Sequence, residues 1–423
     1  MQTQTVKPFV ISKALVFEGY QKVKAKGGGP GVDGQSIHAF EEKLKDNLFK
    51  LWNRMSSGTY FPLPVRAVEI PKKEKGTRTL GIPTVSDRIA QTTVSKALEP
   101  NVEPMFHADS YAYRPGKSAL DAVAKCRERC WKYDWVIDLD IKSFFDTVPH
   151  DQILELVSKH TNERWVLLYV ERWLKAPLQR QDGTLTARDR GTPQGSAISP
   201  LLVNIFMHYA FDSWMEEEFP YLPFERYSDD VIVHAKTKRQ ASYVKAMITS
   251  RLESYGLELH PEKTKIVYCK DDRRKGDHEH IAFDFCGYTF RPRRAKNSKD
   301  KSVFTRFLPA IANSSAKKIK ANMKAWRFKQ QGGTDLAKLA MKINPIVSGW
   351  INFYGKFFPS RLVQVLNHLN LLLVKWAQRK YKRLKTSKSR AWLWLAAVAR
   401  REPQLFAHWY FGASPAGWAT RAG

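Results

Sequence analysis

The stretch FERYSDDVIVHA, residues 224–235, holds two short runs of strand-forming residues separated by Ser-Asp-Asp. Aromatic and β-branched residues dominate Phe224–Tyr227 and Val231–Ala235, and such residues favour strands. We therefore predict a β-hairpin that presents Asp229 and Asp230 at its tip. Aspartate pairs are common turn formers, so this feature by itself does not predict a chemical role.

A second acidic strand is predicted upstream, in VIDLDI (Val136–Ile141). Its apolar residues alternate with Asp138 and Asp140, as on a half-buried strand whose acidic side chains share one face. If this strand and the hairpin are neighbours in one sheet, Asp140 meets Asp229 and Asp230. Three carboxylates suit Mg²⁺. Nucleotidyl transfer needs two such ions, one to lower the pKa of the attacking hydroxyl and one to hold the triphosphate.

The chain is strongly basic, because its 423 residues include 70 Lys and Arg against 41 Asp and Glu, a formal net charge of +29. Such a field attracts polyanions and makes their binding steeply salt-dependent, so nucleic acid is the first expected partner. A membrane is the competing partner, but no uninterrupted apolar run approaches the length of ~20 residues that a spanning helix needs. The N-terminus has no basic stretch followed by an apolar one, so no secretion signal is visible and we expect an intracellular, cytoplasmic protein that is associated with nucleic acid.

The basic residues are concentrated in two segments. Residues 291–330 hold thirteen Lys or Arg and one acid, and residues 375–401 hold ten Lys or Arg and no acid. Concentrated charge of one sign is the expected footprint of a phosphate-binding track. The residues that we expect to contact nucleic-acid phosphates are Lys317, Lys318, Lys320, Arg327, Arg379, Lys380, Lys382 and Arg383.

The four cysteines are too few and too scattered for a disulfide scaffold or a zinc ribbon. Cys126 and Cys130 follow Ala119 and Val123 at helical spacing. We therefore interpret them as core residues on the inner face of a helix.

The stretch RPRRAKNSKDKS, Arg291–Ser302, is polar, contains proline and lacks hydrophobic periodicity, so we interpret it as a linker. Strand and helix patterns are mixed before it. After it, apolar residues recur at helical spacing, which predicts helices over Ile311–Trp326, Leu336–Phe358 and Leu362–Leu384. The sequence thus predicts an α+β unit followed by a helical one.

Three blocks resemble motifs of reverse transcriptases. DIKSFFD (Asp140–Asp146) resembles motif A, GTPQGSAISPLLVNIFM (Gly191–Met207) resembles motif B, and RYSDD (Arg226–Asp230) resembles the catalytic Tyr-X-Asp-Asp box. Further blocks, in a consistent order, resemble group II intron enzymes. They are GVDG (Gly31–Gly34), VEIPKKEKGTRTLGIPTVSDR (Val68–Arg88), SYAYRPGKSALDAV (Ser110–Val123), YGLELHPEKTKI (Tyr255–Ile266), FCGYTF (Phe285–Phe290) and the thumb motif SGWINFYGKFF (Ser348–Phe358).

This resemblance implies an α+β right-hand polymerase, with fingers and palm followed by an α-helical thumb/maturase domain. The implied parts are an N-terminal extension (1–60), fingers and palm (61–290), a basic linker (291–302), a helical thumb/maturase (X) domain (303–385) and a basic C-terminal tail that is a candidate DNA-binding remnant (386–423). We expect no C-terminal endonuclease module, because no cysteine follows Cys286 and the only histidines after Tyr354 are His368 and His408.

The resemblance also implies roles for single residues. Asp140, Asp229 and Asp230 match the metal-binding triad. The residues that match the nucleotide-binding positions are Lys72 and Arg78 for the triphosphate, Phe145 against the 2′ position of the sugar, and Gln194 and Gly195 in the loop beside the incoming nucleotide. Lys263 matches a general acid for the pyrophosphate leaving group, with Lys265 as the alternative. Ser228 stands where the family usually has alanine.

The implied function is that of an RNA-directed DNA polymerase of a group II intron, with two Mg²⁺ ions, that also assists intron splicing and mobility. Its expected partners are an RNA template with a DNA or RNA primer, dNTPs, intron RNA and target DNA. Two alternatives stay open: a domesticated group II-like reverse transcriptase used in defence or repair, and a splicing cofactor without a physiological polymerase role. The complete Asp triad favours the polymerase, because a splicing cofactor could lose it without harm.

Overall fold

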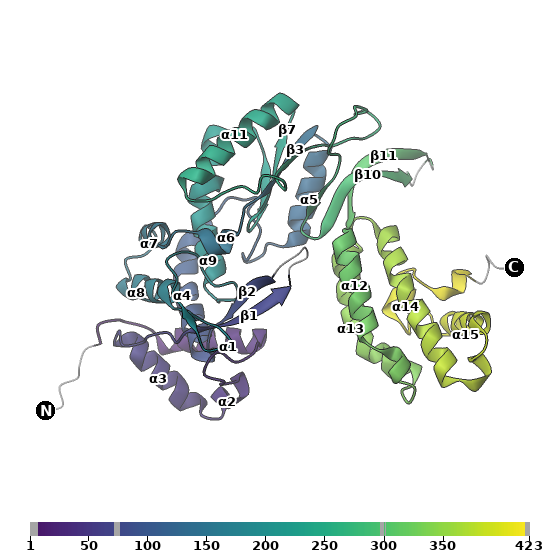
Figure 1. Cartoon of the computed structure of the whole chain (residues 1–423), viewed down its shortest axis with the longest axis horizontal. Helices are drawn as coiled ribbons and strands as arrows, with labels where there is room; N and C mark the ends of the chain where they lie inside the picture. Colours follow the sequence, from purple (N-terminus) through teal and green to yellow (C-terminus); the bar gives the residue numbers. More distant parts are fainter. Residues whose placement is uncertain (1–6, 72–76, 297–299, 301, 419–423) are drawn as a thin grey trace. The chain divides into compact units, whose positions relative to one another are not determined.

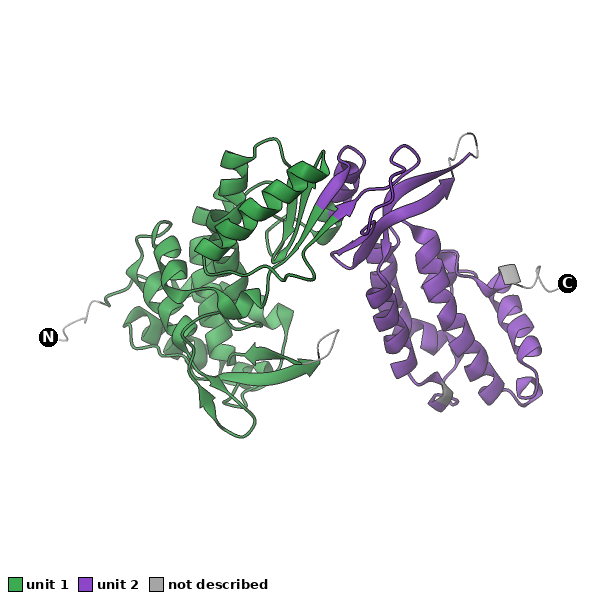
Figure 2. Ribbon diagram, turned by 45° about the horizontal axis from the view of Figure 1, so that its top comes forward, with its two compact units in different colours: residues 1–122, 137–266 green, residues 123–136, 267–423 purple. Residues whose placement is uncertain are grey.

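The computed structural model describes all residues except 1–6, 72–76, 297–299, 301 and 419–423. The chain forms two compact units (Figure 2), of which the first comprises residues 1–122 and 137–266 and the second residues 123–136 and 267–423. Among the described residues, no helix combines the length and the apolar character that crossing a membrane requires.

The first unit mixes helices and strands (Figure 1). A π-helical turn, η2 (His208–Asp212), joins α9 to α10, while α5 (Ala119–Cys130) extends from the first unit into the second. Cys126 and Cys130 are completely buried on α5, which confirms their interpretation as core residues. The other helices are α1 (Lys13–Lys26), α2 (Ile37–Glu41), α3 (Leu44–Ser56), α4 (Val85–Val102), α6 (Phe144–Thr147), α7 (His150–Ser158), α8 (Arg164–Lys175), α9 (Ser199–Met207), α10 (Ser213–Glu218) and α11 (Lys238–Ser254).

Two four-stranded sheets organise this part of the chain. One has the order β6-β7-β3-β8, and the other has the order β2-β1-β4-β5. The first sheet confirms the predicted hairpin and the predicted acidic strand, because β6 pairs with β7 in antiparallel fashion and β3 is the next strand. The strands are β1 (Val65–Pro71), β2 (Thr77–Ile82), β3 (Trp135–Asp140), β4 (Leu178–Gln179), β5 (Leu185–Thr186), β6 (Phe224–Tyr227), β7 (Asp230–Ala235) and β8 (Lys265–Tyr268).

Helix α4 lies in the core of the first unit, and α1 packs along it. The approach is close, because a Cβ added at Gly19 would lie 2.8 Å from Thr93 Oγ1. From α4, the Arg88 guanidinium donates hydrogen bonds to the carbonyls of Gly27 and Gly29, at 3.1 and 2.9 Å. The N-terminal helices are thus built into the same core as the rest of the unit.

The second unit combines a three-stranded sheet of order β11-β10-β9 with a helical bundle. The three helices predicted after residue 303 are confirmed, and the apolar faces of the bundle meet in one buried cluster that includes Ile343, Leu369 and Leu395. The elements are β9 (Phe283–Phe285), β10 (Tyr288–Lys296), β11 (Val303–Ile311), α12 (Asn313–Ala325), α13 (Leu336–Tyr354), α14 (Pro359–Lys380), α15 (Lys388–Arg401) and α16 (Ala407–Tyr410).

The prediction that Arg291–Ser302 form a linker is wrong for residues 291–296. Arg291–Lys296 continue β10, which pairs with β11 in antiparallel register from Tyr288 opposite Ile311 onward. The Arg293 side chain belongs to this sheet as well, because its guanidinium donates to the Leu308 carbonyl at 3.1 Å. The basic residues of β10 have no alternating apolar pattern. They form a strand because they pair with β11, and not because of a local periodicity. The unit expected to be helical from residue 303 therefore begins with β11.

The predicted basic tail from residue 386 is a folded part of the second unit. Residues Lys388–Arg401 form α15, whose buried Ala391, Leu395 and Ala399 pack in the same cluster as α14. The positive charge of this segment does not indicate a tail, because the basic residues lie on the outer face of an amphipathic helix.

Candidate active site

Asp140 is the last residue of β3, one of the two inner strands of its sheet. The turn before β8 holds the backbone at this point: the Asp140 carbonyl accepts a hydrogen bond from the His260 N–H at 2.7 Å, and the Asp140 N–H donates to Thr264 Oγ1 at 3.3 Å. The side chains of Asp138 and Asp140 are both half-buried, whereas Leu139 between them is buried. The predicted alternation is therefore correct, and the end of β3 presents a carboxylate from a fixed backbone.

The β6–β7 hairpin closes with Tyr227 paired to Asp230, so Ser228 and Asp229 form a two-residue turn. Ser228 has φ +63°, and a positive φ at the first turn position is characteristic of the type II′ turns that close hairpins. This left-handed backbone costs a residue other than glycine roughly 1–2 kcal/mol. The sequence predicted that the three carboxylates converge if the acidic strand and the hairpin are neighbours in one sheet. This condition is met, because β7 is the hydrogen-bonded neighbour of β3.

Asp229 and Asp140 are close enough to interact electrostatically. Burial raises the pKa of the Asp229 carboxyl, and the charge of Asp140 raises it further, while the Ser228 hydroxyl and Arg78 act in the opposite direction. A cation between the carboxylates would relieve both the burial cost and the repulsion. Asp230, also half-buried, begins the adjacent strand. These hard oxygen donors are the ligand type that Mg²⁺ prefers.

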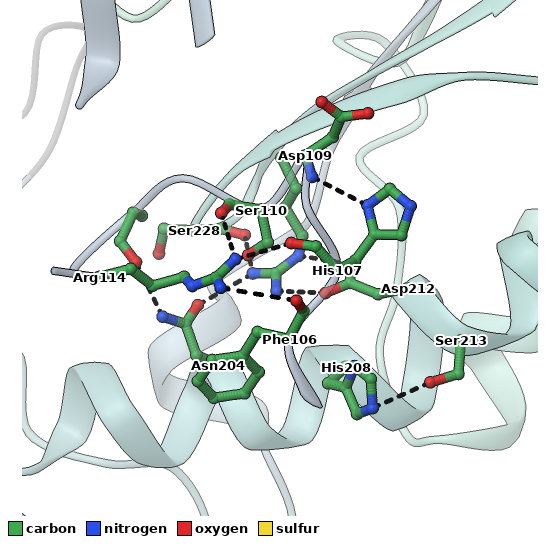
Figure 3. Close-up of polar contacts among 12 residues, drawn as sticks. Phe106, His107, Asp109, Ser110, Arg114, Asn204, His208, Asp212, Ser213 and Ser228 are labelled. Carbon is green, nitrogen blue, oxygen red and sulfur yellow. Dashed lines mark hydrogen bonds and ion pairs between the residues drawn. The ribbon is translucent and has the colours of Figure 1, made fainter. Parts of the chain in front are cut away.

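A buried ion pair supports the turn. Arg226 and Asp212 are completely buried, and the guanidinium donates to both carboxylate oxygens, at 2.7 and 2.6 Å. The same guanidinium donates to Asn204 Oδ1 at 3.0 Å and to the Ser228 carbonyl at 3.3 Å, while Asn204 Nδ2 donates to the Ala112 carbonyl at 2.8 Å. Figure 3 shows Asn204, Asp212 and Ser228 in this network. The strained turn is thereby joined to the buried side of α9 and η2.

Sequence analysis gave Arg226, Asp212 and Asn204 no role. A signal for Arg226 was present, because an arginine within a short apolar strand must find a buried partner of opposite charge. The partner could not be identified, since Asp212 lies 14 residues upstream and belongs to a π-helical turn that the local pattern does not predict.

Phe144 and Phe145 follow β3 and have different surroundings. Phe144 is buried, at 2% exposed, whereas Phe145 is half-buried. The Phe145 carbonyl accepts a hydrogen bond from the Thr192 N–H at 2.7 Å. At the neighbouring Gly191, an added Cβ would lie 2.7 Å from the backbone carbonyl of Asp146, so only glycine permits this approach. The motif B loop therefore holds the turn that carries Phe145.

The other end of that loop contacts strand β2. The Gln194 carbonyl accepts a hydrogen bond from the Gly81 N–H at 2.8 Å. Gly195 has φ +114°, and an added Cβ there would lie 2.5 Å from the Gly81 carbonyl. A side chain at position 195 would thus break the backbone contact between β2 and the loop.

Arg78 is exposed on β2, and its positive charge lowers the pKa of Asp229 in the β6–β7 hairpin. The charge of Arg78 therefore acts on one of the three carboxylates. Lys72, the other residue expected at the triphosphate, lies outside the described residues.

Lys263 lies in the turn before β8, next to Thr264, whose hydroxyl accepts the bond from Asp140. Its side chain is exposed, whereas that of Lys265, the first residue of β8, is half-buried. Both lysines belong to the segment that holds the end of β3, and Lys263 is the more exposed of the two residues.

The residues expected to bind nucleic acid are all in the second unit. Lys317, Lys318 and Lys320 are exposed on α12, and Arg327 and Arg383 are exposed beyond the ends of α12 and α14. Burial lowers the pKa of His368 on α14, and charges from both helices lower it further, namely those of Lys320, Lys324 and Lys375. Cations of α12 and α14 therefore act on one region of the bundle.

A cavity of about 800 Å³ at the end of α14 is lined by Lys375, Gln378, Arg379, Lys382 and Lys385. The lining carries four cations and no carboxylate, a composition that suits phosphate groups. Sequence analysis selected Arg379 and Lys382 but not Lys375 or Lys385. Lys380 does not line this cavity. Its ammonium donates a hydrogen bond to the Thr334 carbonyl at 2.6 Å, and Lys380 thereby contributes to the fold.

Comparisons with known proteins agree with this arrangement. Residues 70–290 match the family "Reverse transcriptase (RNA-dependent DNA polymerase)", and residues 316–394 match "Group II intron, maturase-specific domain". The chain is 30% identical over 345 residues to Protein YkfC of Escherichia coli (strain K12), which covers 72% of this chain and 86% of that protein. It is 31% identical over 204 residues to the group II intron-encoded protein LtrA of Lactococcus lactis subsp. cremoris, covering 47% of this chain and 33% of LtrA.

A similar likeness extends to an intron protein of Saccharomyces cerevisiae. The putative COX1/OXI3 intron 1 protein of Saccharomyces cerevisiae is 28% identical over 255 residues, which are 59% of this chain and 29% of that protein. The expected α+β fold with a helical C-terminal part is confirmed. The chain therefore belongs to the reverse transcriptase family of RNA-dependent DNA polymerases and carries a group II intron maturase-specific domain.

Proposed function

We propose that this chain copies RNA into DNA at a site formed by Asp140, Asp229 and Asp230. The observation that carries the proposal is the placement of Asp140 and the half-buried Asp229 on neighbouring strands of one sheet, where their charges interact. Primer extension on an RNA template with dNTPs and Mg²⁺ tests it. Incorporation that requires the RNA template is the expected result, and none by a correctly folded preparation would contradict it.

The three carboxylates would hold two Mg²⁺ ions, which when bound lower the pKa of the primer 3′-hydroxyl and orient the triphosphate. Arg78 would neutralise triphosphate charge from β2, together with Lys72. Gln194 and Gly195 would border the incoming nucleotide, in a loop that approaches β2 closely because Gly195 has no side chain. Lys263 would give a proton to the pyrophosphate as it leaves.

We infer that Phe145 selects deoxynucleotides, because its half-buried ring follows the catalytic strand and is held by the motif B loop. Phe145→Ala or Phe145→Val should open space beside the sugar 2′ position and admit ribonucleotides. The ratio of dNTP to rNTP incorporation efficiency should fall by roughly tenfold or more, the effect of about 1.4 kcal/mol. An unchanged ratio with intact synthesis would place Phe145 in the core. Tyr221→Ala, an exposed aromatic elsewhere in the first unit, is the control.

We propose a second activity, assistance to intron splicing, on the match of residues 316–394 to the maturase-specific domain and on the cations of α12 and α14. Intron RNA and the template–primer duplex would both lie against this basic surface, with target DNA as a further partner. Phosphate contacts would set the affinity, while base contacts would set the choice of sequence. We propose the domain limits 61–290 for fingers and palm and 303–385 for the thumb/maturase domain, on the family matches of residues 70–290 and 316–394.

Neutralising Lys317, Lys318 and Lys320 together should weaken RNA binding and flatten its salt dependence. For every phosphate group that the variant no longer neutralises, the slope of log K against log salt concentration should decrease by roughly 0.7 to 0.9. Binding titrations from low to moderate salt, with unrelated RNA sequences, measure this effect. Replacing the exposed lysines Lys22, Lys43 and Lys45 of the first unit makes a charge-matched control. A variant with wild-type affinity and slope would show that the three lysines are only a solvated face.

A domesticated relative used in defence or repair is the alternative to a mobile intron. The two are distinguished by the DNA that flanks the gene, which for an intron folds as group II RNA when transcribed. Splicing of that RNA in the presence and absence of the protein then tests the maturase activity directly.

A further inference from the structure

Three residues other than glycine have left-handed backbone near the candidate active site: Tyr113, Ser143 and Ser228, with φ of +60°, +50° and +63°. Such a backbone is unfavourable for L residues and persists only where the surroundings determine it. Ser143 belongs to the turn after β3 and Ser228 to the catalytic hairpin. Tyr113, in the SYAYRPG block, has no role in the function proposed above.

Hydrogen bonds involve the residues on both sides of Tyr113, and Figure 3 draws the side chains of Asn204 and Arg114 that make them. The carbonyl before it, of Ala112, accepts from Asn204 Nδ2 at 2.8 Å. The residue after it, Arg114, donates from its guanidinium to the His107 carbonyl at 2.7 Å. Neither bond involves the Tyr113 side chain, so the fold fixes the backbone of Tyr113 independently of its ring.

The same buried side chains hold Ser228. Asn204, which bonds the backbone before Tyr113, accepts a hydrogen bond from the Arg226 guanidinium, and this guanidinium also donates to the Ser228 carbonyl. Asp212 neutralises the guanidinium. One connected network of hydrogen bonds thus reaches both the carbonyl before Tyr113 and the carbonyl of Ser228.

The backbone places Tyr113 and Ser228 close together near Asp229, because the Tyr111 N–H donates to the Arg226 carbonyl at 2.9 Å, two residues before each of them. Tyr113 is 57% accessible as a residue, whereas Ser228 is 4% accessible. Partial desolvation of its hydroxyl raises the pKa of the Tyr113 phenol and the nearby charge of Asp229 raises it further, while the Ser228 hydroxyl acts in the opposite direction. Because this hydroxyl also lowers the pKa of Asp229, it lies near both groups.

No group among the described residues meets the distance and angle of a hydrogen bond to the buried Ser228 hydroxyl, although the hydroxyl is near enough to Asp229 and Tyr113 to lower the pKa of both. A buried hydroxyl that lacks a partner is unfavourable, so its presence indicates a bond that forms in another state of the site. The Tyr113 phenol is a donor close enough to supply it. Alanine, the usual residue of the family at this position, could not accept such a bond.

We propose that Tyr113 is a positioning residue whose exposed ring contacts the last base pair of the primer–template duplex, and that the Ser228 hydroxyl ties this ring to the metal-binding hairpin. The inference rests on the proposed polymerase function and adds a substrate contact to it. An aromatic ring suits this place because every base pair has an apolar face, so the contact tolerates any sequence. The bond between the two hydroxyls closes when the duplex holds the ring in place.

Tyr113→Gly tests the contact, because glycine removes the ring and also accepts the left-handed backbone without strain. Steady-state primer extension should show the KM for primer–template raised roughly tenfold, within the range that base–aromatic stacking supplies. The kcat should change by less than about twofold, since the carboxylates are untouched, and the melting temperature should not fall. A purely structural role for Tyr113 predicts the opposite pattern, a lower melting temperature and an unchanged KM. Tyr221→Ala, another exposed tyrosine of the first unit, should leave KM unchanged.

A double-mutant cycle tests the bond between the hydroxyls. Tyr113→Phe and Ser228→Ala should each raise the KM about threefold, as loss of one neutral hydrogen bond would, and the double variant should be no worse than either single one. Additive effects in the double variant would overturn the bond, and a KM within twofold of wild type for Tyr113→Gly would overturn the contact. Failure of the wild type to extend any primer would instead overturn the proposed function, and this inference with it.

Discussion

Asp229→Ala or Asp230→Ala is expected to abolish DNA synthesis while leaving RNA binding nearly intact. The carboxylates would hold the two cations, whereas affinity for RNA would come from lysine and arginine of the second unit. If a metal ion contributes ~4 kcal/mol of transition-state stabilisation, its loss slows extension roughly a thousandfold. Single-nucleotide incorporation, measured beside RNA binding on the same preparations, separates the two properties. Retained extension by the double variant would remove these residues from the catalytic site.

Two matched control variants test whether the loss of synthesis is specific to Asp229 and Asp230. Asp189→Ala removes an acid that is 86% exposed in the first unit, and it should leave extension unchanged. Asp138→Asn changes the half-buried aspartate on the same face of β3 as Asp140. Because Asp138 does not match the metal-binding position of the family, its variant should keep most of the activity. A complete loss in Asp138→Asn would make it a fourth metal ligand.

Asp212→Ala is expected to destabilise the first unit strongly. It leaves the completely buried Arg226 guanidinium without its counter-ion, and breaking a buried pair from one side costs about 3–5 kcal/mol. Chemical denaturation monitored by a probe in the first unit measures this loss. A free energy of unfolding within about 1 kcal/mol of wild type would show that Arg226 finds another acceptor.

The exposed pair of Lys142 and Glu258 provides the comparison. Both side chains are more than half exposed, so Glu258→Ala should change the free energy of unfolding by about 0–1 kcal/mol, although the ion pair is only 3.0 Å long. The double variant Asp212→Leu with Arg226→Met should recover part of the stability, since it removes both buried charges. It should not recover full activity, because the Ser228 carbonyl loses its donor.

Much of the candidate site was predictable from local sequence. The alternation around Asp138 and Asp140 predicts a strand because successive side chains point to opposite faces, and the Ser-Asp-Asp tip predicts a turn because its residues favour one. The helices of the second unit were predictable for the same reason, since each has an apolar face at helical spacing. The strand β10 was not predictable in this way. Its basic residues form a strand only because β11, from a later part of the chain, pairs with them.

The sequence by itself determined the basic character of the second unit and the family, and it singled out the three carboxylates that we propose to be catalytic, because residue types and their order along the chain are sufficient for these. The tertiary structure alone decided which side chains support the site. Arg226 meets Asp212 and Asn204 through packing of segments that no local periodicity connects. Buried polar groups must find partners wherever the fold brings them, so their pairing is a property of the packed chain and not of any one stretch of it.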